Sequence, residues 1–184
     1  MTTLDTLCTR NKEFAASKHP AGLAMMPATK TMVIGCADPR VDPELIFGLE
    51  LGDAAVIRNV GGRVTPSTLQ TMAMLRMVGQ AEGAAPGPGW NLVVLHHTDC
   101  GITRLAQYPD MLASYFGVEA SDLPGLGVSD PWVSAAVDVA ALKANPFLPA
   151  EFVVSGLVYD VNTGLVDVAV APTLLRQEGA ASRS

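Results

Sequence analysis

The chain has 184 residues, of which 49% are hydrophobic and only 5% aromatic, and its mean hydropathy is +0.30. A chain of this length and apolar content can bury a sizeable core, so global disorder is excluded. Eighteen acidic residues against twelve lysines and arginines give a formal net charge of −6. Because a surface that tracks phosphates needs the opposite sign, we do not expect a nucleic-acid partner.

The sequence gives no sign of membrane insertion or secretion. No uncharged apolar run is long enough for a membrane-spanning helix, and the first residues include no apolar segment of signal-peptide length. The three cysteines cannot all pair within one chain. We therefore expect a cytoplasmic protein without a membrane partner, in which a cysteine and histidine cluster indicates metal binding or catalysis rather than disulfides.

Strand-like and helix-like segments alternate along the chain. Helices are predicted from start signals and apolar spacing at 5–17, 44–49, 65–78 and 132–144. Buried strands are predicted from short apolar runs at 31–36, 54–59, 91–97 and 152–161. The triplet Asn162-Thr-Gly164 predicts a hairpin turn into a last strand at 165–170, and the turn-rich segment 109–129 indicates mixed structure.

This order predicts an α/β fold built as a single domain over residues 1–184. The early strands are continuously apolar, which is typical of a mostly parallel central sheet covered by helices. The hairpin near the C-terminus adds an antiparallel edge. Residues 1–28 are expected to form an N-terminal helix and arm, and residues 172–184 a frayed tail.

Cysteine and histidine side chains stand at the ends of two predicted strands. Cys36 ends the first strand, and His97 to Cys100 follow the third. Sites in open parallel sheets form outside the carboxyl ends of the strands, so the two segments can meet there. Two thiolates and one imidazole are a soft donor set suited to zinc. We therefore predict one Zn²⁺ per chain, bound by Cys36, His97 and Cys100.

Three protein ligands leave a fourth position open, which is typical of a catalytic zinc that carries a water molecule. Zinc bound by two thiolates is a weaker Lewis acid than zinc bound by three histidines, so a neighbouring base would assist it. Asp38 and Arg40 lie just beyond Cys36. A carboxylate held by a guanidinium stays ionised and oriented, so we expect Asp38 to aim the nucleophile and Arg40 to position Asp38.

Two motifs carry a resemblance to a known family: Cys36-Ala-Asp-Pro-Arg40 and His97-Thr-Asp-Cys-Gly101. Together with Val56-Ile-Arg-Asn-Val60 and the segment 156–164, they resemble the β-class carbonic anhydrases over residues 5–170. The resemblance is to the compact archaeal and mycobacterial-like branch. It implies zinc at the three residues named above, the Asp38–Arg40 dyad, and reversible hydration of CO₂ to bicarbonate by a metal-bound hydroxide.

The resemblance also implies a homo-oligomer, a dimer with the active site near the subunit interface or a tetramer made of two dimers. It places Val60, Gly61 and Gly62 along the substrate pocket and the Gly101 amide beside the site. Family members often carry a larger residue where Gly62 stands, so a roomier or differently shaped pocket is expected here.

The substrate is left open between two chemistries. The same branch includes enzymes that hydrolyse carbonyl sulfide or carbon disulfide to H₂S and CO₂ with the same ligands. A wider, more apolar channel near Gly61 and Gly62 would favour carbonyl sulfide, whereas the ligands themselves serve either substrate.

Three alternatives concern single residues. A non-catalytic structural zinc would need a fourth protein ligand, and Cys8 is the only spare cysteine. Asp38 could instead close onto the zinc when its contact with Arg40 is lost, as the resemblance suggests for some relatives. Because side chains alternate along a strand, His96 should point away from a zinc that His97 binds, which favours a packed histidine over a proton shuttle.

Overall fold

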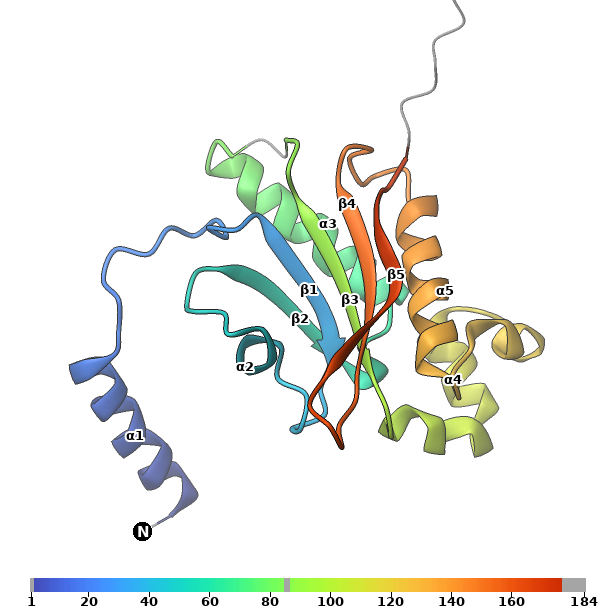
Figure 1. The fold of residues 1–184 in the computed structure, drawn as a ribbon, viewed down its shortest axis with the longest axis horizontal. Coiled ribbons are helices and arrows are strands. Elements are labelled where there is room, and N and C mark those ends of the chain that lie inside the picture. Colours follow the sequence, from blue (N-terminus) through green and yellow to red (C-terminus); the bar gives the residue numbers. More distant parts are fainter. Residues whose placement is uncertain (1, 85–86, 177–184) are drawn as a thin grey trace, which may run out of the picture.

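The computed structural model describes residues 2–84 and 87–176. Its centre is one five-stranded sheet in the order β2-β1-β3-β4-β5 (Figure 1). The strands are β1 (Thr31–Cys36), β2 (Ala54–Asn59), β3 (Asn91–His97), β4 (Val153–Tyr159) and β5 (Val166–Leu174). The first four run parallel, and β5 pairs antiparallel with β4. The predicted single-domain α/β fold with an antiparallel edge hairpin is confirmed.

The helices begin where proline or a capping side chain favours them. They are α1 (Thr3–Ser17), α2 (Pro43–Phe47), α3 (Pro66–Ala81), α4 (Pro109–Phe116) and α5 (Pro131–Ala144). Three short 3₁₀ segments complete the list: η1 (Val60–Gly62), η2 (Gly101–Gln107) and η3 (Ala120–Leu126). The side chain of Asp42 caps α2 and that of Asp130 caps α5, each by accepting hydrogen bonds from first-turn N–H groups. The segment 109–129, where the sequence indicated mixed structure, contains α4 and η3.

Both faces of the sheet are covered, which explains the continuously apolar strands. The larger core lies between the sheet and helices α3 and α5 and includes Met32, Ile34, Met72, Leu92, Val94, Val139 and Leu142. The opposite face packs against α2 and the segment before it, through Val33, Val41, Phe47 and Leu95. Among residues 2–84 and 87–176, no helix combines the length and apolarity needed to cross a bilayer.

The C-terminal edge differs from the expectation of a tail from residue 172. Strand β5 continues through Leu174, which pairs with Val153, and Leu175 is buried in the core. Pro172 lies between Val170 and Thr173, where the β4–β5 register is irregular, and proline is tolerated at such positions. Residues 177–184 of the predicted tail lie outside the described residues.

Helix α1 stands apart from the sheet at the end of an extended arm (Figure 1). None of its 15 residues is buried. Thr2 and Asp5 form a reciprocal capping box that sets where the helix begins. Its apolar side chains Leu4 and Leu7 are 68% and 55% exposed.

Candidate metal centre

Cys36, His97 and Cys100 come together at the carboxyl edge of the sheet. Cys36 is the last residue of β1 and His97 the last of β3, and these strands are neighbours. One potential ligand atom from each of the three residues lies within 4.8 Å of the others, and all three residues are buried. The two sulfur atoms are 3.8 Å apart. The structure therefore assembles the three side chains that the sequence singled out.

The imidazole of His97 is oriented for a metal. Its Nδ1–H donates to the carbonyl oxygen of Thr98 at 2.9 Å, which leaves the lone pair on Nε2. Nε2 is buried and has no hydrogen-bond partner among the described residues. A buried nitrogen without a partner is costly, whereas a bound metal would satisfy it. Two sulfurs and one such nitrogen fit Zn²⁺.

The two thiols differ in acidity because they share a hydrogen bond. The contact with Cys100 lowers the pKa of Cys36 below that of an ordinary thiol, against the opposing effect of burial. The same contact, together with burial, raises the pKa of Cys100. The backbone N–H of Asp38 also donates to the Cys36 sulfur at 3.4 Å. These hydrogen bonds favour the thiolate form of Cys36, which is the form that binds a metal.

Asp38 and Arg40 form an ion pair next to this cluster, where the Asp38 backbone N–H contacts the Cys36 sulfur. Both the backbone N–H and the Nε–H of Arg40 donate to Asp38 Oδ1, at 2.9 and 3.0 Å. Nη2 donates to Oδ2 at 2.8 Å. These hydrogen bonds lower the pKa of Asp38 to about 2. The carboxylate is therefore ionised and fixed through both oxygens, and it is not one of the three clustered ligands.

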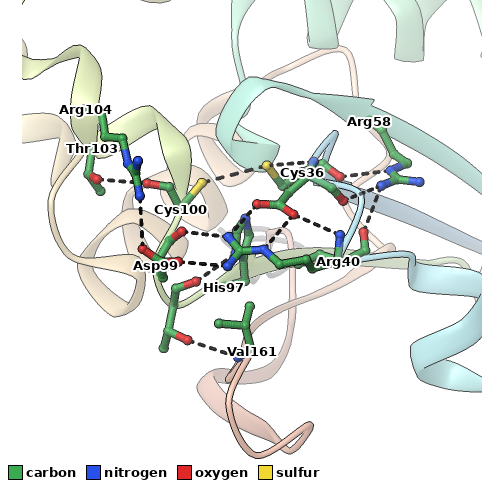
Figure 2. Close-up of polar contacts among 12 residues, drawn as sticks. Cys36, Arg40, Arg58, His97, Asp99, Cys100, Thr103, Arg104 and Val161 are labelled. Atoms are coloured by element: carbon green, nitrogen blue, oxygen red, sulfur yellow. Dashed lines mark hydrogen bonds and ion pairs between the residues drawn. The ribbon is translucent and has the colours of Figure 1, made fainter.

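Two side chains that the sequence analysis did not single out brace this loop. Arg58, on β2, donates to three backbone carbonyls of the loop after β1, those of Cys36, Asp38 and Val41, at 2.8–3.0 Å. Asp99 Oδ2 accepts a hydrogen bond from Arg40 Nη1 at 2.8 Å (Figure 2). Both residues lie inside the motifs noted above, but the amino-acid sequence does not show where their side chains point.

The expected pocket residues fall into two groups. Val60 and Gly101 are exposed, and a Cβ added to Gly101 would meet open space. Gly61 and Gly62 are buried, and both have positive φ. A Cβ on Gly62 would lie 2.9 Å from the backbone of Gly35 and Cys36, and one on Gly61 would lie 2.7 Å from the side chain of Ile102. The expectation that Gly62 widens a pocket is therefore wrong, because backbone fills that space.

The loop that carries these glycines is anchored by a hydrogen bond from a side chain outside the loop. The Tyr115 hydroxyl donates to the carbonyl oxygen of Val60 at 2.8 Å. Burial raises the pKa of Tyr115 to about 12, so the hydroxyl stays a donor.

A cavity of about 50 Å³ borders His97 and Cys100 and is lined also by Gly61 and Ile102. It has room for about three or four water-sized groups.

His96 points to the other face of the sheet, as alternation along β3 requires. Its Nε2 lies 3.0 Å from Asp138 Oδ2 on α5, and Asp138 also accepts from Arg63 Nε at 2.8 Å. All three side chains are almost completely buried. The structure therefore supports the interpretation of His96 as a packed histidine rather than a proton shuttle. Arg63 and Asp138 are 75 positions apart, and no local pattern could have paired them.

Comparison with known proteins finds relatives of this chain. Residues 31–118 match the family model for carbonic anhydrase. The chain is 28% identical over 172 residues to β-carbonic anhydrase 1 of Mycobacterium tuberculosis, covering 89% of this chain and 96% of that protein. It is also 28% identical to a carbon disulfide hydrolase of an Acidianus species, covering 71% of this chain and 72% of that protein.

A solved structure agrees with these similarities. The carbonic anhydrase of Streptococcus mutans superposes with a TM-score of 0.71 and is 32% identical, covering 92% of this chain and 98% of the other. The similarity thus spans nearly the full length of both proteins and includes the sheet edge where the three clustered side chains meet. The chain belongs to the β-carbonic anhydrase family of enzymes.

Proposed function

We propose that this chain is a zinc enzyme that hydrates CO₂ reversibly to bicarbonate, with Zn²⁺ held by Cys36, His97 and Cys100. The observation that carries the proposal is the cluster of His97 with two cysteine sulfurs, in which the buried His97 Nε2 has no hydrogen-bond partner within the described part of the chain. A carboxylate fixed by a guanidinium stands next to this set. Similarity to enzymes named carbonic anhydrase supports the same reaction.

When bound, Zn²⁺ supplies a Lewis acid that brings the pKa of a water molecule toward neutrality. Asp38 accepts a hydrogen bond from the attacking oxygen and so directs its lone pair at the carbon of CO₂. Arg40 holds both carboxylate oxygens, so Asp38 does not turn away. Because Arg40 lowers the pKa of Asp38 to about 2, this carboxylate stays ionised above about pH 4. Any loss of activity between pH 8 and pH 5 therefore belongs to another group.

Replacing Asp38 by asparagine tests the role of the carboxylate. We expect kcat for CO₂ hydration to fall by about 10²–10⁴-fold, because an amide accepts a hydrogen bond less strongly and no longer pairs with Arg40. Zinc content should stay at one ion per chain, since Asp38 is not a ligand. The matched control is Asp110→Asn on the exposed start of α4. Full turnover by zinc-loaded Asp38→Asn would overturn the assigned role.

Hydrolysis of carbonyl sulfide or carbon disulfide is the second candidate. The similarity to a carbon disulfide hydrolase favours it, whereas the filled space at Gly62 removes the argument from a wider pocket. Stopped-flow CO₂ hydration and H₂S release from both sulfur substrates should be measured on one zinc-loaded preparation. We expect CO₂ hydration to dominate. Efficient H₂S release with feeble CO₂ hydration would assign the sulfur substrate instead, and no activity in either assay would favour a structural zinc.

We infer that the active protein is a homo-oligomer in which α1 packs against a second copy. Leu4, Leu7 and Phe14 follow a helical spacing along one face of α1, yet no residue of this helix is buried. An isolated helix of this length is marginal in water, so its apolar face needs a partner.

The oligomer is tested by light scattering coupled to gel filtration. Wild-type protein should show the mass of a dimer or a tetramer, and Leu4→Glu with Leu7→Glu should shift the mass toward a monomer. Thr9→Glu, on the opposite face of α1, is the matched control. A monomeric wild-type protein would contradict the inference.

The cytoplasm remains the proposed location. Cys36 and Cys100 are free cysteines with their sulfurs 3.8 Å apart. Both must stay reduced to bind zinc, and a reducing compartment keeps them so.

A further inference from the structure

Arg40 is held from two sides, and only one of them is the dyad with Asp38. On the other side, Nη1 donates to Asp99 Oδ2 at 2.8 Å. Nη2 donates to the backbone carbonyl oxygen of Asp99 at 3.0 Å. Figure 2 shows the Arg40 guanidinium facing Asp99, and hydrogen bonds join the same guanidinium to the Asp38 carboxylate. A single residue thus offers Arg40 both a side-chain and a main-chain acceptor.

The backbone of Asp99 adopts a conformation that makes this double contact. Its φ is 51°, in the left-handed region that residues other than glycine seldom occupy. Aspartate tolerates this region better than most residues. The neighbours over-determine the turn: the Thr98 side chain accepts from the Val161 N–H at 3.1 Å, and Thr103 Oγ1 donates to the Cys100 carbonyl at 2.8 Å. Backbone strain that is held in this way is typical of functional sites.

Coulombic attraction alone does not explain the arrangement. The side chains of Arg40 and Asp99 are 48% and 55% exposed, so solvent screens their charges and the pair adds little to stability. The effect of Asp99 is to restrict the conformational freedom of the Arg40 side chain. Arg40 has a long side chain with many rotamers, and the contacts with Asp99 leave its guanidinium one orientation. In that orientation, Nε and Nη2 meet the two oxygens of Asp38.

We propose that Asp99 is a positioning residue for the reaction, which holds Arg40 so that Arg40 holds Asp38. This rests on the proposed function, in which Asp38 directs the nucleophile. Because Asp99 lies between His97 and Cys100, the same short turn carries two zinc ligands and the anchor of the dyad. The position of the carboxylate is thereby tied to the position of the metal.

Two substitutions at Asp99 keep the turn and remove the contact in steps. Asp99→Asn preserves shape and tolerance of positive φ but removes the charge. Asp99→Gly removes the side chain and leaves the main-chain acceptor. We expect kcat to fall by about 10- to 100-fold in Asp99→Gly and by less in Asp99→Asn, with KM and zinc content unchanged. The matched control is Arg104→Ala, whose charge lies 3.7 Å from Asp99 and which is solvent-exposed; it should stay within about twofold of wild type.

A double-mutant cycle separates positioning from a structural role. If Asp99 acts through Arg40, adding Asp99→Gly to Arg40→Ala costs no further activity. An equal loss in both backgrounds, or a loss of zinc in Asp99→Gly, would overturn the proposal, because either result would mean that Asp99 only shapes the ligand turn.

A second readout does not depend on turnover. Nitrogen NMR of the Arg40 guanidinium, assigned with Arg40→Lys, should give separate Nη1 and Nη2 signals in the wild type, because both are held. The two signals should merge in Asp99→Gly. Merged signals in the wild type would refute the positioning role. Separate signals in an enzyme inactive on CO₂ and on the sulfur substrates would instead mean that the proposed reaction, and not the contact, is wrong.

Discussion

His97→Ala is expected to lose its zinc and, with it, all measurable CO₂ hydration. The imidazole supplies the only nitrogen of the cluster, and its Nδ1–H contact with Thr98 leaves Nε2 as the nitrogen that can bind a metal together with the two sulfurs. Substitution of groups that merely orient a ligand weakens metal binding by about 10- to 100-fold, so loss of the ligand itself should exceed that range. Cys36 and Cys100 alone leave the ion with half of a tetrahedral set.

The measurement is zinc content after dialysis, taken on the same sample as the stopped-flow rate. His19→Ala is the matched control, because His19 is an exposed histidine on the N-terminal arm. In the wild type, chelation should abolish activity, and added Zn²⁺ should restore it. A His97→Ala protein that keeps one zinc per chain and full turnover would mean that the metal is bound elsewhere.

The sequence alone indicated both the clustered cysteine and histidine residues and the strands that position them. The predicted limits of β1, β2 and β3 are those of the structure, because each is a continuous apolar run between turn signals. A cysteine and a histidine at the ends of neighbouring parallel strands must lie at one edge of the sheet. The clustering of Cys36, His97 and Cys100 could therefore be inferred from the sequence.

The contacts behind the ligands could not be inferred in that way. Arg40 and Asp99 are 59 positions apart, and no periodicity reports which way either side chain points. Gly62 was misinterpreted for a related reason, since a glycine in a sequence does not show whether its missing side chain faces a pocket or a neighbouring strand. Local pattern predicts elements and their faces, whereas pairing between distant side chains depends on the assembled fold.

Asp138→Asn is expected to destabilise the fold by about 3–5 kcal/mol, the cost of leaving a buried charge without its partner. The Asp138 carboxylate accepts from Arg63 Nε at 2.8 Å and from Nη2 at 3.3 Å, and His96 Nε2 lies 3.0 Å away. Arg63 is 1% exposed and Asp138 is 2% exposed, so water cannot replace either partner. The Arg63 guanidinium also lies 4.8 Å from the centre of the Phe116 ring, which holds it in place.

Urea unfolding at fixed protein concentration measures this loss as a lower midpoint with an unchanged m-value. Asp110→Asn, exposed on α4, is the matched control and should stay within about 0.5 kcal/mol of wild type. Removing both charges in Arg63→Met with Asp138→Leu should recover much of the stability, because no buried charge is then left unpaired. If Asp138→Asn unfolds at the same urea concentration as the control, the ion pair does not stabilise the fold.

His96 precedes the ligand His97, and Arg63 follows Gly62, which packs on the backbone of Cys36. Loss of the pair should therefore loosen both sides of the metal centre, so zinc should dissociate faster from Asp138→Asn than from the control.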